Sequence, residues 1–225
     1  MTGHLIIIEG GDGSGKATQT RLLTERLQHE GRQVRCVSFP DYDSESSALV
    51  KMYLNGDFGR DANSVNPYAA SAFYAVDRFA SYQTKWKNFL LQGGTVIADR
   101  YTTSNMLYQM IKIEDPAARR RYLDWLWDFE FHKMGLPVPD MVILLDVPLA
   151  VTEQLMAARM GKTGGQTGDI HEQNESFLKK CHEAYDQLAK QYSWQCISCA
   201  LGECMRSVEA IHEDVYSIVL KLLKK

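Results

Sequence analysis

The stretch Glu9-Gly10-Gly11-Asp12-Gly13-Ser14-Gly15-Lys16-Ala17-Thr18 decides how the chain is organised. The apolar run before it, residues 5–8, is typical of a buried strand, and the apolar positions of residues 19–27 repeat at helical spacing. Strand, glycine-rich loop and helix in this order form a P-loop, which matches the pattern GxxxxGK from Gly10 to Lys16. We therefore expect the loop amides and the helix N-terminus to bind phosphate groups.

A tight turn between a strand and a helix is the simpler alternative for such a loop. The strand before it and the helix after it favour phosphate binding, with Lys16 adding positive charge over the β- and γ-phosphates. The position after this lysine normally carries a Ser or Thr whose hydroxyl binds magnesium. Here that position is Ala17, and Thr18 follows one residue late.

Length and composition indicate one α/β domain that needs no disulfide or metal to be stable. The chain has 225 residues, which is near the upper size for such a domain. Its formal net charge of −3 argues against binding a nucleic acid polymer or an anionic membrane surface. No apolar run reaches the roughly 18 residues of a membrane span, and the chain enters a strand without a leader pattern, so we expect a cytoplasmic protein.

The five cysteines form an odd count, which favours reduced thiols. Cys196, Cys199 and Cys204 have a spacing that three zinc ligands can share. No second CxxC or HxxxH pattern completes such a site, so packing is the favoured role of these thiols.

Hydrophobic periodicity predicts a five-stranded parallel sheet with helices on both faces, the fold of P-loop NTPases. After the first strand, the predicted strands are Gln33–Phe39, Thr95–Ala98, Met141–Asp146 and Gln195–Ser198. Besides the helix after the P-loop, the main predicted helices are Ser46–Asn55, Pro67–Leu91, Pro116–Met134, Pro148–Arg159, one ending at Tyr192, and Ser207–Leu223. The glycine-rich segment from Met160 to Gly168 is too polar for a core, and we interpret about 160–171 as a lid on a single domain, 1–225.

Polar residues follow two predicted strands at the edge where open α/β sheets bind ligands. Phe39 begins a loop that contains Tyr42, although a Pro-Asp turn would explain this loop equally well. Asp99 and Arg100 follow the third strand, where a carboxylate can bind magnesium or its water and a guanidinium can bind a phosphate.

Tyr74 and Arg78 lie four residues apart and therefore share one face of a helix. In one interpretation, the Tyr74 ring stacks on a planar ligand and Arg78 donates hydrogen bonds to it. In the other, Tyr74 is a core aromatic residue beside a surface Asp77–Arg78 pair. Periodicity does not separate these alternatives.

Taken together, several motifs closely resemble those of thymidylate kinases. They are the P-loop, Phe39-Pro40, Tyr74-Ala-Val-Asp-Arg78, Asp99-Arg-Tyr101 with Ser104-Asn105 and Tyr108, and Asp169-x-x-Glu172 before a helix. The resemblance covers nearly the whole chain. It implies transfer of the γ-phosphoryl group of ATP to dTMP with Mg²⁺, and a homodimer.

The resemblance also assigns roles to residues. ATP would be bound by Gly10, Gly11, Asp12, Gly13, Ser14, Gly15, Lys16, Ala17, Thr18 and Arg159. The acceptor would be bound by Asp12, Phe39, Tyr42, Tyr74, Arg78, Arg100, Asn105, Tyr108 and Glu172. The catalytic group would be Lys16, Asp99, Arg100 and Lys162, and the metal would lie near Asp99, Asp12 and Glu172.

The chain departs from the family pattern in its positive charges. Relatives usually place an arginine in the P-loop or the lid, whereas here the only basic residue between Gly161 and Gly168 is Lys162. Asp41 stands where many relatives carry a basic or neutral residue. Two other functions therefore remain open: a kinase for another nucleoside monophosphate, and a nucleotide-binding regulatory protein with weak catalysis.

Overall fold

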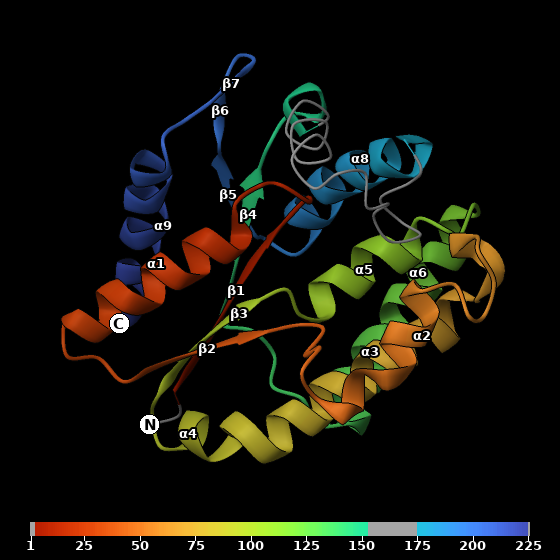
Figure 1. The fold of residues 1–225 in the computed structure, drawn as a ribbon, viewed down its shortest axis with the longest axis horizontal. Helices are drawn as coiled ribbons and strands as arrows, with labels where there is room; N and C mark the ends of the chain where they lie inside the picture. Colours follow the sequence, from red (N-terminus) through yellow and green to blue (C-terminus); the bar gives the residue numbers. More distant parts are fainter. Residues whose placement is uncertain (1–2, 153–174, 225) are drawn as a thin grey trace.

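The structure is a computed structural model, and it describes residues 3–152 and 175–224. Its centre is a five-stranded parallel sheet in the order β2-β3-β1-β4-β5, which confirms the predicted fold class (Figure 1). The strands are β1 His4–Gly10, β2 Val34–Ser38, β3 Thr95–Asp99, β4 Met141–Asp146 and β5 Gln195–Ser198.

Helices cover both faces of the sheet. The α-helices are α1 Lys16–His29, α2 Ala48–Leu54, α3 Pro67–Ser81, α4 Lys87–Leu91, α5 Thr102–Met110, α6 Pro116–Trp127, α8 Glu175–Gln191 and α9 Val208–Leu223. Short 3₁₀ helices lie at η1 Glu45–Ser47 and η2 Ala62–Ser64. Helices α1 and α9 pack side by side on one face, while α5 and α8 pack together on the other (Figure 1).

Strand β1 shows why the sheet is buried on both faces. Ile6 and Ile8 belong to the core under α1 and α9, whereas Leu5 and Ile7 pack with aromatic residues of the opposite layer. Side chains alternate between the two faces of a strand, so a strand with helices on both sides must be apolar throughout. The continuous apolar run of β1 therefore identifies a central strand.

The register of the sheet brings the predicted functional loops to one edge. Ile8 of β1 pairs with Asp99 of β3, and Asp99 also pairs with Ser38 of β2. Because parallel strands end at a common edge, the P-loop, the loop after β2 and the residues after β3 all leave the sheet together.

Two predicted helices contain a wider π-helical turn. The predicted helix 67–91 is divided into α3, the π segment η3 Tyr82–Trp86 and α4, and helix α6 continues into the π segment η4 Asp128–Lys133. The spacing of apolar residues in the sequence does not reveal such turns. The one extra residue of a π-helical turn rotates the apolar face of the helix without ending the helix.

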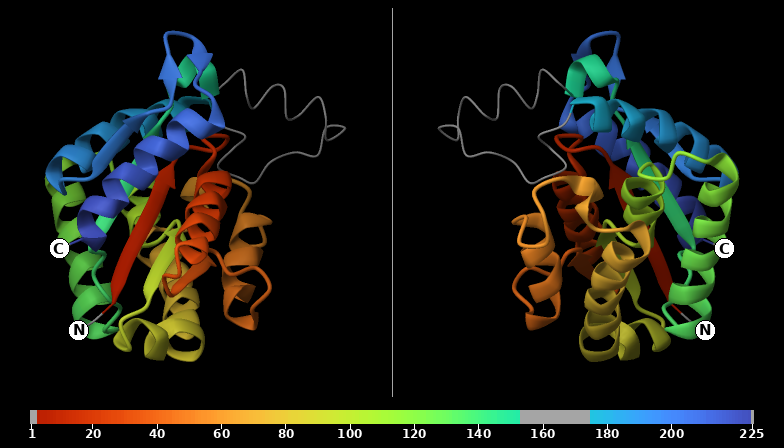
Figure 2. Two further views of the ribbon diagram at one scale, coloured as in Figure 1. Left: turned by 90° about the vertical axis from the view of Figure 1, so that its left-hand side faces the viewer. Right: turned by 90° about the vertical axis from the view of Figure 1, so that its right-hand side faces the viewer.

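The antiparallel hairpin of β6 Ala200–Leu201 and β7 Cys204–Met205 was not predicted from the sequence. Its strands have two residues each, too few for an alternation signal, and Gly202 turns the chain at φ 61°. The hairpin projects from the end of the molecule in all views (Figures 1 and 2). Across the described ranges, no helix has the length and apolarity that crossing a membrane requires.

Candidate functional site

A cavity of about 500 Å³ opens at the carboxyl edge of the sheet. Its lining includes the predicted residues Asp12, Gly13, Gly15, Lys16, Ala17, Thr18, Phe39, Tyr42, Tyr74, Arg78, Asp99, Arg100, Asn105 and Tyr108. Residues from five separate segments of the chain thus meet around one space. Of the P-loop residues, Gly10, Gly11 and Ser14 are not in this lining; Gly10 and Ser14 are buried behind it.

The P-loop forms one end of the cavity. Gly15 precedes α1 in a left-handed conformation with φ 90°, so Lys16 is the first residue of the helix. The Lys16 Nζ donates to the Gly11 carbonyl oxygen at 2.7 Å and lies 3.8 Å from the Asp12 carboxylate. Burial, together with the charge of Arg100, lowers the pKa of Lys16 to about 8, although Asp12, Glu9 and Asp99 oppose this shift.

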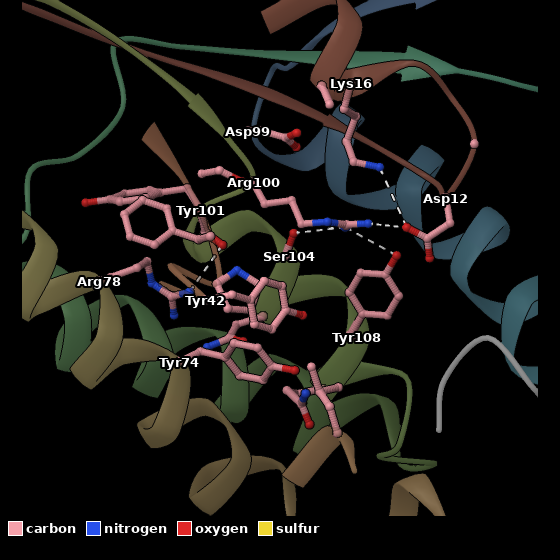
Figure 3. A pocket seen from close by; sticks show the side chains of 18 of the residues that line it. Asp12, Lys16, Tyr42, Tyr74, Arg78, Asp99, Arg100, Tyr101, Ser104 and Tyr108 are labelled. Atoms are coloured by element: carbon pink, nitrogen blue, oxygen red, sulfur yellow. Dashed lines mark hydrogen bonds and ion pairs between the residues drawn. The ribbon is translucent and has the colours of Figure 1, made fainter. Parts of the chain in front are cut away.

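Arg100 occupies the middle of the cavity (Figure 3). Its backbone has φ 67°, a left-handed conformation that costs a non-glycine residue energy and is concentrated at functional sites. Its guanidinium is paired with the Asp12 carboxylate and lies 3.5 Å from Glu9 Oε1. It also donates to Ser104 Oγ and Tyr108 Oη, each at 3.4 Å. Asp12 therefore shares its charge between two cations, Arg100 and Lys16.

Glu9 is a buried carboxylate next to the Arg100 guanidinium, and it accepts hydrogen bonds from α5 and α8. Its Oε2 accepts from Thr103 Oγ1 at 2.7 Å and Ser104 Oγ at 2.8 Å, and its Oε1 accepts from Tyr185 Oη at 3.2 Å. Its side chain is fully inaccessible. A buried charge requires such partners, so Glu9 fixes Arg100 relative to α5 and α8.

Asp99 ends β3 beside the P-loop lysine (Figure 3). Burial raises the pKa of its carboxyl, while Lys16 and Arg100 pull the pKa down. The side chain is half-buried and lines the cavity between the P-loop and Arg100. It is therefore a cavity-lining carboxylate close to two cations, Lys16 and Arg100.

The far end of the cavity is formed by α3 and α5. Tyr74 is half-buried, and its ring packs edge-on against Tyr53 at a centroid distance of 6.3 Å. Asn105 is buried on α5, and its Nδ2 donates to the Ser71 carbonyl oxygen at 3.2 Å. Phe39 is buried against Tyr101, whereas Tyr42, which also lines the cavity, is half exposed.

The alternative interpretation of a surface Asp77–Arg78 pair is wrong, because both side chains are about 1 % exposed. Arg78 forms a two-point ion pair with Glu130, at 2.8 Å through Nε and 2.6 Å through Nη2. Asp77 instead accepts from the Asp41 backbone N–H at 2.8 Å and from Ser46 Oγ at 2.6 Å. Asp77 thus holds the loop after β2 in place, and Asp41 also pairs with Lys85.

Three predicted site residues, Arg159, Lys162 and Glu172, lie outside the described residues, as does the predicted lid at about 160–171. Among described residues, sequence reasoning missed Glu9, Ser104, Asp77 and Glu130 as parts of the site. Glu9 had a readable signal, since it is the single carboxylate directly after the apolar run of residues 5–8. Glu130 had none, because Asp128, His132 and Lys133 lie close to it in the sequence.

Comparison with known proteins agrees with this geometry. A sequence model of the family described as thymidylate kinase matches residues 8–215. The thymidylate kinase of Mycobacterium tuberculosis is 32% identical over 193 residues, covering 83% of this chain and 86% of its own. A probable thymidylate kinase of Pyrococcus horikoshii is 31% identical over 219 residues, covering 97% of both chains.

Human thymidylate kinase is 29% identical over 216 residues, covering 95% of this chain and 88% of its own. The solved thymidylate kinase of Candida albicans shares the fold, with a TM-score of 0.72 at 22% identity over 98% of this chain and 92% of that one. The match of the family model across most of the chain, over a P-loop cavity with the geometry described above, shows that this protein belongs to the thymidylate kinase family.

Proposed function

We propose that the protein transfers the γ-phosphoryl group of ATP to dTMP, giving dTDP. One observation carries the proposal: a single cavity has a P-loop at one end, an aromatic plate with Arg78 and Asn105 at the other, and Arg100 between them. Phosphoryl transfer needs alignment of donor and acceptor and neutralisation of charge, with little covalent chemistry by the protein.

In this proposal each end of the cavity binds one substrate. The P-loop amides and Lys16 bind the donor phosphates, and Arg100 exchanges part of its contact with Asp12 for the acceptor phosphate. Tyr74 stacks on the thymine, Arg78 and Asn105 bind its polar edge, and Tyr108 lies against the deoxyribose.

Magnesium is included in the proposal as the ion that neutralises the donor phosphates. The chain offers it the Asp99 carboxylate, while Ala17 offers no hydroxyl. In the described ranges no cluster of three or more His, Cys, Asp or Glu side chains is arranged to hold a metal ion. This fits Mg²⁺, which keeps several waters and binds through one or two carboxylates plus substrate phosphates.

The remaining parts of the proposal rest on the family. A lid at about 160–171 would bring Lys162 to the phosphates, with Arg159 at the adenine and Glu172 near the acceptor. A homodimer is supported by the exposed apolar side chains of α2 and α3, among them Leu49, Val76 and Phe79. A cytoplasmic location is supported by the five free cysteines.

The test is a phosphorylation assay with ATP and a panel of nucleoside monophosphates. We expect dTMP to have the highest kcat/KM and Lys16→Ala to lower kcat about 100-fold or more while the protein stays folded, because the lysine charge acts on the transferring group. A higher kcat/KM for another monophosphate would indicate a different kinase. ADP binding with no turnover of any acceptor would indicate a regulatory protein.

A further inference from the structure

A buried carboxylate, Glu130, stands behind the far end of the cavity without lining it. It lies on the π segment η4, and its side chain is fully inaccessible. It accepts from Arg78 Nε and Nη2 and, at 2.7 Å, from Thr102 Oγ1. Asn105 Nδ2 lies 3.5 Å from its Oε1. Both side chains proposed to bind the base edge therefore share one carboxylate.

These contacts decide which atoms of Arg78 and Asn105 remain for a ligand. Arg78 uses two of its three nitrogens on Glu130, and the third, Nη1, makes only a 3.5 Å contact with the Tyr101 carbonyl oxygen. Asn105 uses its Nδ2 on the Ser71 carbonyl oxygen and Glu130, and no donor within residues 3–152 and 175–224 reaches its Oδ1. Arg78 thus offers the cavity its remaining N–H donors, and Asn105 offers one acceptor.

The orientation of the Asn105 amide follows from the charge of Glu130. A carboxylate only accepts hydrogen bonds, so it faces the amide N–H₂ group and turns the carbonyl oxygen away. The Ser71 carbonyl is a second acceptor on the same side. A neutral amide in place of Glu130 would present its own donor and would leave only the Ser71 carbonyl to hold the Asn105 amide in this orientation.

We propose that Glu130 is a positioning residue that sets the hydrogen-bond polarity of the base site, through its contacts with Arg78 and Asn105. A donor beside an acceptor matches pyrimidines with a keto group next to a ring N–H, as in thymine and uracil. Cytosine carries an amino group and an unprotonated ring nitrogen at the same edge, so it meets donor with donor and acceptor with acceptor. The inference rests on the proposed function, because it assumes that the base lies at this end of the cavity.

The test compares kcat and KM for dTMP, dCMP and ATP in the wild type and in Glu130→Gln, which keeps the shape and removes the charge. We expect KM for dTMP to rise about 10- to 100-fold, and the dTMP-to-dCMP ratio of kcat/KM to fall about 10-fold or more. KM for ATP should change less than about 3-fold, because Glu130 does not touch the P-loop. Binding of dTMP without ATP, measured by calorimetry, should weaken in parallel.

Two further variants separate positioning from general stability. Leu188→Ala removes a buried side chain of α8 that is not in the cavity lining, so it should lower the melting temperature and leave the dTMP-to-dCMP ratio unchanged. Thr102→Val removes one hydrogen bond to Glu130 and should shift the ratio in the same direction by a smaller factor. It provides the decisive measurement if Glu130→Gln fails to fold.

In an Arg78→Ala background, Glu130→Gln should cause much less additional loss of base selectivity, because the two residues act as one unit. An unchanged ratio in folded Glu130→Gln, or in Thr102→Val if that variant must decide, would overturn the inference while wild-type turnover of dTMP still supported the proposed function. A wild type without dTMP turnover and without dTMP binding would refute both.

Discussion

Lys16, which we propose to bind the ATP phosphates, has a lowered pKa. Its Nζ is buried at the start of α1, and burial, helped by Arg100, lowers its pKa to about 8. The charged form, which we propose that ATP binding requires, is therefore lost in the free enzyme as pH rises through about 8. Bound phosphates restore that charge by attraction, so the free enzyme and the complex should respond differently to pH.

We expect kcat/KM for ATP to fall above pH 8, while kcat stays level to higher pH. The first quantity reports the free enzyme and the second the complex. Steady-state kinetics from pH 6 to 9.5 would measure both. Lys112 is the control, because burial lowers its pKa to about 8 as well. Lys112→Met should leave the fall of kcat/KM above pH 8 unchanged. Loss of this fall in Lys112→Met would show that Lys16 is not its source.

Asp99 is the carboxylate that we propose for magnesium. Asp99→Asn keeps the shape and removes the charge, so the Mg²⁺ concentration needed for half-maximal kcat should rise about 10-fold or more. The melting temperature of the ligand-free variant should not fall, because burial disfavours the charged form of Asp99, as its raised pKa shows. Titration of kcat with Mg²⁺ at saturating ATP tests this.

Asp146 provides a matched control for that titration. It ends β4 at the same edge of the sheet, and burial also raises its pKa, but it is not in the lining of the main cavity. Asp146→Asn should leave the Mg²⁺ requirement unchanged. Equal requirements in wild type and Asp99→Asn would remove Asp99 from the metal site.

At the level of elements, the P-loop is held by close backbone packing against β4. A Cβ atom on Gly10 would lie 2.9 Å from the Leu145 carbonyl oxygen and 2.7 Å from Ser14 Oγ, and Gly10 has φ 154°. Gly11, its neighbour, has nothing within 4 Å of such an atom. Adjacent glycines of one loop therefore have different structural requirements.

Gly10→Ala should destabilise the ligand-free protein by about 1 to 3 kcal/mol, because backbone atoms cannot move aside cheaply. Gly11→Ala should change the free energy of unfolding by less than about 0.5 kcal/mol, as at most open surface positions. Urea denaturation of both variants measures the difference. Equal midpoints and slopes for the two variants would contradict the packing argument.

For the whole molecule, the exposed apolar side chains of α2 and α3 are the surface that we propose for dimerisation. Val76 is 46 % and Phe79 is 37 % exposed on α3, and Leu49 on α2 is 42 % exposed. We expect the wild type to be a dimer by light scattering and Val76→Glu to shift it toward the monomer, because a charge would be buried in the interface. Substitution at an exposed site should leave the fold of each chain intact.

Leu201 is the matched control for dimerisation, since it is 76 % exposed but lies on the β6–β7 hairpin. Leu201→Glu should leave the molar mass measured by light scattering at that of the dimer. Dissociation by Leu201→Glu and none by Val76→Glu would place the interface elsewhere.

Local patterns were enough to predict the sheet and one end of the cavity. The strand Met141–Asp146 has the predicted bounds, because a buried parallel strand is apolar and ends abruptly in polar or turn residues. The edge strand Gln195–Ser198 also has the predicted bounds, although only Ile197 in it is buried. The P-loop glycines and Lys16 form a continuous segment, so their geometry follows from adjacent residues. The shared edge of the sheet then placed Asp99 and Arg100 near them.

The packing of distant elements decided what surrounds these residues. Glu130 meets Arg78 across 52 positions, and Glu9 meets Tyr185 across 176. A carboxylate directly after an apolar run, such as Glu9, indicates that a partner must exist, since burying an unpaired charge is costly, but it does not show which partner. Glu130 has Asp128 and His132 beside it in the sequence and lacks even this signal. That choice depends on how α3, α5 and the π segment η4 pack, because helix faces meet through contacts that no local period encodes. The partners of the base-site residues therefore became identifiable only in the folded chain.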